Sequence, residues 1–314
     1  MKTFLRLTLF AIFGSLFAST VVPQLTVFPA GKVDRSFGDG GTKAVGPAYI
    51  PGEVIRLSSG KLVWISSEQP FTSGLIIHVL KTSIDGDRDT SFGPNGSVDF
   101  SFGLGNFGIS AAEEAGGSLI VVGSTQATGD ARQLDIVVFR VRLDGTLDPN
   151  FGTGGSFIKN FGTANEFSED SASAVAVLPD GKILVGATST RYSTYPSRGT
   201  TTAEIIRLNP NGTIDTSFGT SGLVELSIGN NQAGTTFAQH FVYFTSYDDG
   251  RFLAAFNADR PTANGFLQEG EVARFFSDGS LDKGFGNGGR LLIPYLPNRS
   301  FLHLRETHEN SPGR

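Results

Sequence analysis

Four side chains between residues 188 and 202 have the chemistry of a binding site. They are Arg191, Tyr192, Tyr195 and Arg198. Tyrosine and arginine combine a large contact area with directional hydrogen bonds, which is why both are enriched at binding hot spots. We predict that these four residues bind a protein or a glycan. The alternative interpretation is an exposed loop without a partner.

The carboxylates of the chain offer a second kind of chemistry. Glu166, Glu169 and Asp170 form the densest acidic cluster, and carboxylate oxygens are ligands that calcium prefers. A solvated loop is nevertheless the favoured interpretation of such a charge run. The run 85–89 resembles the start of an EF-hand, but Thr90 stands where that loop requires glycine, so we exclude an EF-hand.

The sequence contains no known catalytic or metal-binding motif of histidine, cysteine or serine. The 4 histidines lack an H-x-x-x-H pair, and neither a G-x-S-x-G motif nor a phosphate-binding glycine loop occurs. Because the chain has no cysteine, it forms no disulfide and offers no thiol nucleophile or cysteine-ligated zinc. We therefore predict no catalytic residue, no metal site and no cofactor. The chain has a net charge of −5 and no stripe of basic residues, so nucleic acid is not an expected partner.

The elements that must position these residues belong to a repeat protein. The pattern G-x-x-D-x-x-F-G-x-x-G occurs five times, with every pattern position filled in each copy. Such self-similarity indicates units that bury their apolar faces only against their neighbours. The copies, which we call connectors, span residues 31–41, 86–96, 145–155, 212–222 and 279–289.

The repeated aspartate and phenylalanine of each connector are predicted to be structural. One aromatic side chain per unit suits the gap between adjacent units, where a buried phenylalanine typically contributes about 3 to 5 kcal/mol. The aspartate can accept hydrogen bonds from nearby backbone N–H groups. It can also pair with a basic residue that recurs five positions before the connector glycine, at Lys81, Arg140, Arg207 and Arg274. The ten connector residues are Asp34, Phe37, Asp89, Phe92, Asp148, Phe151, Asp215, Phe218, Asp282 and Phe285.

The stretch from one connector to the next predicts four β-strands. Within residues 156–222, four apolar or alternating runs are rich in β-branched residues, and Asp180-Gly181 suits a two-residue hairpin turn. Four antiparallel strands per unit, with no helix between units, are typical of a β-propeller. We predict an all-β propeller of about five blades with four antiparallel strands each. The four runs are 156–159, 174–178, 183–187 and 203–208.

The two ends of the chain predict how the ring closes. Leu25–Pro29 would supply the fourth strand of a blade, and Arg290–Leu296 with Ser300–Arg305 its first and second strands. The last blade would then be shared between N- and C-terminal strands, which removes exposed edge strands. The alternative is an incomplete chain. In this scheme the first strands converge on the central axis and carry Lys43, Asp99, Lys159 and Glu225.

The first 20 residues have the features of a secretory signal peptide. Lys2 and Arg6 are basic, the run 7–17 is almost wholly apolar, and small residues follow. This apolar run is shorter than the roughly 20 residues of a membrane helix. We predict a signal peptide at residues 1–20, a single propeller domain without a membrane span at residues 21–314, and a secreted, periplasmic or cell-surface location.

The connector and the segment V-L-P-D-G-K-I-L-V-G at residues 177–186 resemble the delta-60 repeat family, which is also grouped as a β-propeller of unknown function. The likeness is clearest at 145–155, 177–186 and 205–222, and weaker copies extend it from about residue 25 to residue 305. The resemblance implies a propeller found mainly in exported bacterial proteins, with no established enzymatic activity. It transfers no catalytic residue.

The uniformity of the repeat, with no non-repeated cluster of histidine and acid, favours a non-enzymatic function. We predict an exported propeller that acts as a protein- or glycan-binding or structural module, through variable loops on the face opposite the connectors. The alternative is a propeller hydrolase or lyase with a metal or carboxylate site at the central channel. Enzymatic activity therefore stays open.

Overall fold

A computed structural model describes residues 33–293 except for 36, 38, 45–49, 69–75, 104, 127–132, 164–165, 193–198, 231–242 and 263–264. The described residues form four sheets, each with four antiparallel strands in chain order. The predicted signal peptide at residues 1–20 lies outside the described residues. Within the described part, we find no helix with the length and hydropathy of a membrane span.

The strands follow the β-branched and alternating runs of the sequence. The first sheet comprises β1 (Ile50–Arg56), β2 (Leu62–Glu68), β3 (Ile76–Thr82) and β4 (Ser97–Phe100), with the 3-10 turn η1 (Pro94–Gly96) before β4. The second sheet comprises β5 (Asn106–Glu113), β6 (Leu119–Thr125), β7 (Asp135–Val141) and β8 (Ser156–Lys159). The third comprises β9 (Phe167–Val177), β10 (Ile183–Tyr192), β11 (Gly199–Leu208) and β12 (Leu223–Asn230). The fourth comprises β13 (Tyr243–Ser246), β14 (Phe252–Thr262), β15 (Gly265–Phe275) and β16 (Arg290–Ile293).

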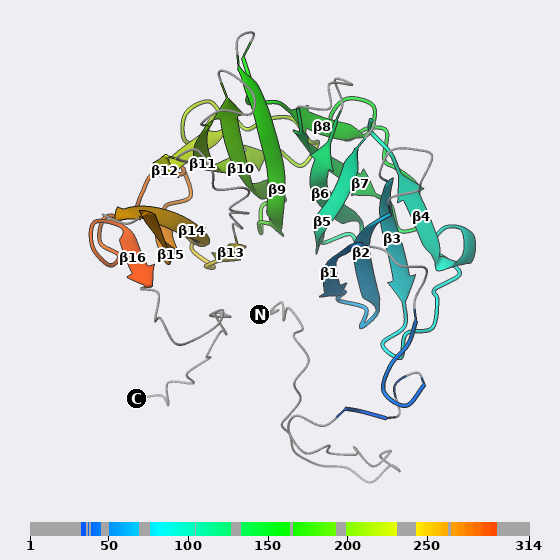
Figure 1. The fold of residues 1–314 in the computed structure, drawn as a ribbon. Helices are drawn as coiled ribbons and strands as arrows, with labels where there is room; N and C mark the ends of the chain where they lie inside the picture. The colour runs from blue at the N-terminus through cyan, green and yellow to red at the C-terminus, as the bar shows by residue number, and fades with distance from the viewer. Residues whose placement is uncertain are drawn as a thin grey trace.

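The four sheets lie around a common centre, with the first strand of each sheet on the inside (Figure 1). Radially arranged four-stranded sheets make a β-propeller, so the predicted all-β propeller class is confirmed. The predicted count of five blades is not matched, because the described residues form four sheets. Leu25–Pro29 and Ser300–Arg305, predicted for a shared fifth blade, lie outside the described residues. Arg290–Ile293, predicted as the first strand of that blade, is instead the outermost strand of the fourth sheet.

The connectors lie inside the sheets, between the third and fourth strands, and not between successive blades as we predicted. The connector at 145–155, for example, joins β7 to β8. A periodic sequence can be divided at any point, so the pattern determines the order of the strands but not which strand is innermost. As a consequence, Asp99, Lys159 and Glu225 lie on the outermost strands β4, β8 and β12 and not at the axis. Lys43 lies outside the named strands.

Each connector packs on the turn that opens the next connector. The N–H of Gly152 donates to the carbonyl oxygen of Asn211 at 2.8 Å. Gly212 has a φ of +79°, and a Cβ atom there would lie 2.6 Å from the nitrogen of Gly152 and 2.9 Å from the ring of Phe151. Glycine is therefore required at this position both by its backbone conformation and by the close approach. Equivalent hydrogen bonds join Gly93 to Asp144 and Gly219 to Asp278.

The connector phenylalanines lie in the apolar layers between sheets. Phe92 packs with residues of the first and second sheets, Phe151 with the second and third, and Phe218 with the third and fourth. All three side chains are buried. Phe37 and Phe285, in the first and last connectors, are half-buried. The hydrophobic core is thus a series of inter-sheet layers, each with one connector phenylalanine.

The connector aspartates lie in turns that compensate their charge. Asp215 accepts hydrogen bonds from the Ser217 N–H at 3.1 Å and from Arg207 Nε at 2.7 Å, and it pairs with Lys182 at 2.8 Å. Burial acts to raise the pKa of Asp89, but hydrogen bonds from Lys61 and Ser91 outweigh it and lower that pKa to about 2. The pKa values of Asp148 and Asp215 are lowered as well, so these three connector carboxylates are held in their charged form. Ion pairs of the same kind join Lys61 to Asp89, Arg140 to Asp148 and Arg274 to Asp282.

Candidate functional site

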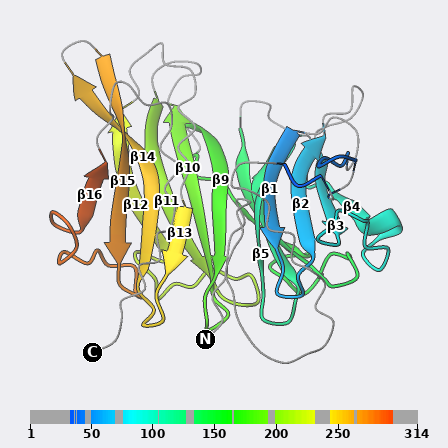
Figure 2. The ribbon, with the colours of Figure 1, turned by 90° about the horizontal axis from the view of Figure 1, so that it is seen from below.

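The third sheet is extended at the end where its innermost strand begins, which we call the far end. Its strands β9, β10 and β11 have 11, 10 and 10 residues, whereas β5, β6 and β7 of the second sheet have 8, 7 and 7. The fourth sheet is extended as well, because β14 and β15 have 11 residues each. Figure 2 shows the third sheet extending beyond the first. The stretch 188–202, which we predicted as a loop, consists mostly of β10 and β11. The far end is therefore an ordered extension of the sheet on both sides of residues 193–198.

Two of the four predicted binding residues lie at this far end and contact carboxylates of their own sheet. Arg191 pairs with Glu204 at 2.7 Å and with Glu225 at 3.4 Å. The hydroxyl of Tyr192 donates a hydrogen bond to Glu169 Oε2 at 3.2 Å. The other two predicted residues, Tyr195 and Arg198, lie outside the described residues.

Consecutive residues of β9 direct their side chains to opposite faces of the third sheet, as in any strand. Asp170 shares its face with its register partner Ser189 on β10 and, beyond it, Thr202 on β11. This face meets the second sheet, because Ala172, Ala187 and Ile206 on it pack with Ile136 and Val138 of β7. At the edge of β9, the N–H of Asp170 donates to the carbonyl oxygen of Leu134 at 2.9 Å. We call the polar contact between the second and third sheets the seam; it comprises Asp135, Asp170, Ser189, Arg191 and Glu204.

Asp170 is a fully buried carboxylate in the seam. Its Oδ2 accepts hydrogen bonds from the Phe161 N–H at 2.8 Å and the Ser168 hydroxyl at 2.9 Å. Burial raises the pKa of Asp170 to about 6, although Ser189, Phe161 and Ser168 act in the opposite direction; the charge of Asp135 raises it further. Asp170 therefore takes up a proton in a pH range in which an ordinary aspartate is charged.

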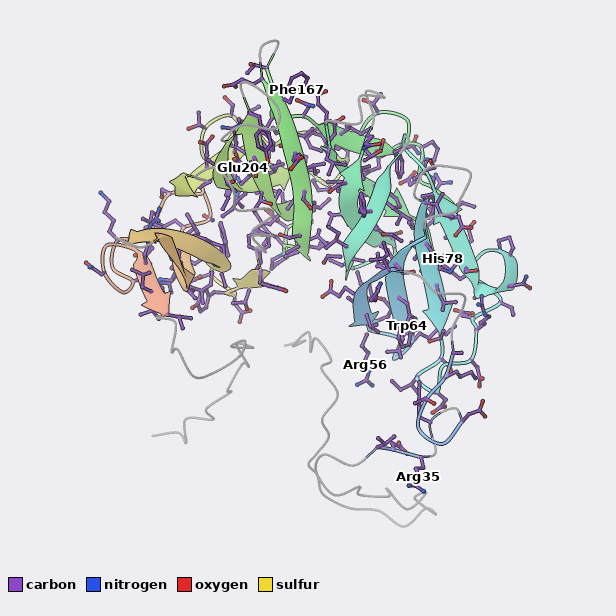
Figure 3. The ribbon with its side chains drawn as sticks, viewed as in Figure 1. Arg35, Arg56, Trp64, His78, Phe167 and Glu204 are labelled. Carbon is purple, nitrogen blue, oxygen red and sulfur yellow. The ribbon has the colours of Figure 1, made fainter. Side chains whose placement is uncertain are left out.

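Glu204 is the second fully buried carboxylate of the seam, with an exposed fraction of 0% (Figure 3). Its Oε1 accepts hydrogen bonds from the Thr202 hydroxyl at 2.6 Å and from Arg191 at 2.7 Å. Burial raises the pKa of Glu204 to about 7, and the charges of Glu225 and Asp170 raise it further, whereas Thr202 and Arg191 act to lower it. One arginine is therefore too little to keep Glu204 fully ionised at neutral pH.

Glu169 lies on the opposite face of β9, where it is half-buried. Burial raises its pKa, and the hydrogen bond from Tyr192 acts in the opposite direction. Phe167 precedes it on the same face, at the far end of β9 (Figure 3). A carboxylate that is only partly exposed and has a raised pKa is a candidate proton donor in catalysis.

A second half-buried carboxylate lies on an innermost strand in the first sheet. Glu53 belongs to β1 and accepts a hydrogen bond from the Ser110 hydroxyl of β5 at 2.5 Å. Both Glu53 and Glu169 therefore stand on strands that line the inside of the arc of sheets (Figure 1). Within the described residues, no three histidine, aspartate or glutamate side chains are grouped to hold a metal ion.

Serine, histidine and aspartate also occur in one row, across the first sheet. Ser66, His78 and Asp99 are register partners on β2, β3 and β4, and His78 Nδ1 lies 2.5 Å from Asp99 Oδ1. The Asp99 side chain is 55% exposed, whereas the aspartate of a catalytic triad is buried. This row therefore lacks the features of a nucleophilic site.

The seam was missed from the sequence for a structural reason. Asp170 was interpreted as part of a solvated loop, which is wrong, because it lies in a strand and is fully buried. Glu204 carried no motif at all. The stretch T-T-T-A-E-I-I of β11 could have indicated it, because a charged residue stands there at the point where the strand changes from polar to apolar residues.

Two comparisons with protein families and curated proteins bear on the fold. Residues 117–151 and 178–218 match the sequence profile of a family described as a domain of unknown function (DUF5122) beta-propeller. This match supports a β-propeller domain of unknown function. The narrower delta-60 repeat assignment stays a prediction. A search of curated proteins finds no match.

Several solved structures share the general architecture at low identity. An endo-1,5-alpha-L-arabinanase from Thermotoga petrophila RKU-1 is 16% identical over 74% of this chain, with a TM-score of 0.38, and the chain spans 58% of that protein's length. A thermostable family-43 glycoside hydrolase is 11% identical over 82% of this chain and 76% of its own, with a TM-score of 0.42. An endo-arabinase from Bacteroides thetaiotaomicron VPI-5482 is 12% identical over 82% of this chain and 98% of its own, with a TM-score of 0.39.

The predicted non-enzymatic binding or structural module is corrected by these findings. That prediction depended on the absence of an acid cluster outside the repeat. The far end of the third sheet contains three non-repeated carboxylates with raised pKa, Asp170 and Glu204 on one face and Glu169 on the other. The similar solved structures are also enzymes by their titles, although likenesses this distant identify neither an activity nor a substrate for this chain.

Proposed function

We propose that the protein is a hydrolase or lyase that uses carboxylate acid–base chemistry on the inside of the propeller. Glu169 is the general acid. The observation that carries this proposal is the environment of Glu169: it is half-buried on the innermost strand β9, its pKa is raised by burial, and it has Tyr192 as a hydrogen-bond donor at 3.2 Å. General acids work best when their pKa lies near the working pH.

Tyr192 orients the acid. Because its hydroxyl donates to Glu169 Oε2, the proton of the neutral carboxyl group resides on Oε1 and is available to a leaving group. Glu53 on β1 is the candidate for the second carboxylate, which would activate water or accept a proton. Enzymes that cleave glycosidic bonds use two carboxylates in different environments.

The test is a hydrolysis screen of the chain against chromogenic glycosides and polysaccharides, followed by Glu169→Gln on any substrate that is cleaved. We expect kcat to fall by about 10²- to 10⁴-fold, the usual contribution of a general acid. Glu166→Gln, three residues away before β9, is the matched control and should retain activity. Tyr192→Phe should move the alkaline limb of the pH–rate profile upward, because Tyr192 lowers the pKa of Glu169. Activity that survives Glu169→Gln would remove this residue from the mechanism.

We also propose that the propeller has a fifth blade, to which residues 33–44 belong. A Cβ atom at Gly86 would lie 3.3 Å from the ring of Phe37, and Lys43 pairs with Asp87 at 2.5 Å. The first connector therefore contacts the turn of the next connector as Phe151 contacts Gly212. This contact supports a blade that precedes the first described sheet.

A further inference from the structure

The seam contains buried oxygens that no hydrogen bond satisfies. Asp170 Oδ1 and Glu204 Oε2 have no hydrogen-bond partner in the described structure, and both side chains are fully buried. The hydroxyl of Ser189, the register partner of Asp170 on β10, makes no hydrogen bond of acceptable geometry, although it is close enough to Asp170 to oppose the rise of its pKa. A buried charged oxygen without a partner is costly, whereas a protonated carboxyl group is not charged and can donate a hydrogen bond itself.

The two carboxylates of the seam lie close to each other. Glu204 Oε1 bonds to Thr202, which stands in the same register row as Asp170 and Ser189, so the Glu204 carboxylate is held near that row. Adjacent strands are about 4.8 Å apart. Glu204 itself lies two residues beyond Thr202 on β11, opposite Ala187. Two such groups in a buried site cannot both ionise without a large repulsion.

Among the residues that the structure describes, the charged groups that face the seam do not balance. From the second sheet come Asp135 on β7, which accepts a hydrogen bond from Asn160, and Lys159 on β8, whose ammonium group lies 5.0 Å from the ring centroid of Phe161. From the third sheet come Arg191 on β10, which pairs with Glu204, and Glu225 on β12, whose side chain is 46% exposed. With Asp170 and Glu204 both ionised, four carboxylates would therefore face two cations.

From this geometry we infer that the seam is a pH-sensitive junction between the second and third sheets, closed while Asp170 and Glu204 hold protons and loosened as they ionise. Folded-state burial raises the proton affinity of both groups above that of the open, solvated state. The folded seam therefore binds more protons than the open one, and its stability falls as pH rises. The loss begins near the ordinary values of 3.8 and 4.5 and is complete near pH 6 for Asp170 and pH 7 for Glu204. This inference concerns the sheets and does not depend on the proposed activity.

Hydrogen exchange measured by mass spectrometry on the full chain tests the seam directly. After correction for the intrinsic pH dependence of exchange, the opening constant of peptides covering β9 and the first half of β11 should rise by about 100-fold from pH 5 to pH 7.5. Peptides of the connector at 145–155, whose Phe151 packs between the same two sheets, are the internal reference. They should show no comparable rise.

Variants decide whether the two carboxylates are the cause. Glu204→Gln and Asp170→Asn are made as separate single variants, so that one can still be measured if the other does not fold. Each should remove most of the 100-fold rise in the opening constant. Glu166→Gln is the matched control and should keep it. The inference is overturned if seam and connector peptides share one pH dependence, or if both variants retain the wild-type profile.

Discussion

The connectors and the seam contain the same kinds of charged side chain, but their carboxylates behave in opposite ways. In the connectors, the pKa of Asp89 is lowered to about 2, and those of Asp148 and Asp215 are lowered as well, because basic side chains and backbone donors outweigh burial. In the seam, burial raises the pKa of Asp170 to about 6 and that of Glu204 to about 7. Asp170 and Glu204 are much more deeply buried than the connector aspartates, which have basic side chains beside them, so the depth of burial and the supply of cationic donors together decide the sign of the pKa shift.

This difference separates scaffold from site. A carboxylate with a basic partner in every repeat strengthens the fold in its charged form. A buried carboxylate with too few donors weakens the fold when it ionises, and proteins usually keep such groups where function requires them. The comparison therefore directs attention to the far end of the third sheet and away from the repeated residues.

The largest expected effect is the loss of a connector phenylalanine. Phe151 is fully buried between the second and third sheets and lies under Arg140, whose guanidinium is 4.9 Å from the ring centroid. Phe151→Ala should lower the free energy of unfolding by about 3 to 5 kcal/mol, because a large cavity remains in a packed layer. Urea denaturation followed by circular dichroism measures this change.

Phe285→Ala is the matched control for this substitution. Phe285 occupies the same pattern position, and Arg274 lies 4.9 Å from its ring centroid, but the side chain is only half-buried. Its loss should therefore cost about half as much as that of Phe151. Equal losses for the two variants would contradict the interpretation that burial between neighbouring sheets is what the repeated phenylalanine provides.

A smaller effect is expected for the connector glycine. Gly212→Ala places a Cβ atom 2.6 Å from the nitrogen of Gly152, at a φ of +79°. The clash and the left-handed backbone together should cost about 2 to 3 kcal/mol. Gly154→Ala, at a φ of +63° with nothing within 4 Å, isolates the backbone contribution and should cost about 1 kcal/mol. If the two variants unfolded at the same urea concentration, the contact between successive connectors would contribute nothing.

The sequence predicted the scaffold better than the site, and the reason is physical. The connector residues repeat, so the pattern itself indicated that they serve the packing of each unit. The pattern did not indicate where to divide the repeat, which is why Lys159 and Glu225 were placed at the axis and are found on outermost strands. Hydrophobic periodicity gives the order of strands but not their distance from a common centre.

The far end of the third sheet was harder to predict, because its polar strands do not follow an apolar pattern. The stretch 188–202 contains few apolar residues, so it was interpreted as a loop although it extends β10 and β11. Asp170 and Glu204 are 34 positions apart in the sequence and meet only through the register of three strands. Contacts between strands are not visible in the local spacing of residues, on which motif analysis depends.

The smallest expected effect tests whether the stability of the connectors and that of the seam depend on pH in opposite directions. Asp89 is bound by Lys61 at 2.8 Å, and its side chain is 9% exposed. Because its folded pKa lies below the ordinary value of 3.8, it stabilises the fold above that pH and loses this contribution as pH falls through about 2. Asp89→Asn should therefore lower the free energy of unfolding at pH 5 by about 2 kcal/mol, the usual range for hydrogen bonds to a charged group, and the difference from wild type should shrink towards zero near pH 2. The exposed Asp180→Asn is the control.

A series of urea titrations of the wild-type protein from pH 2 to pH 8 tests both regions together. The contribution of the connectors to the free energy of unfolding should fall at the acid end, and that of the seam at the neutral end. The free energy of unfolding should therefore be greatest near about pH 4 to 5. A wild-type curve that only rises with pH would contradict the opposite signs assigned to the two regions.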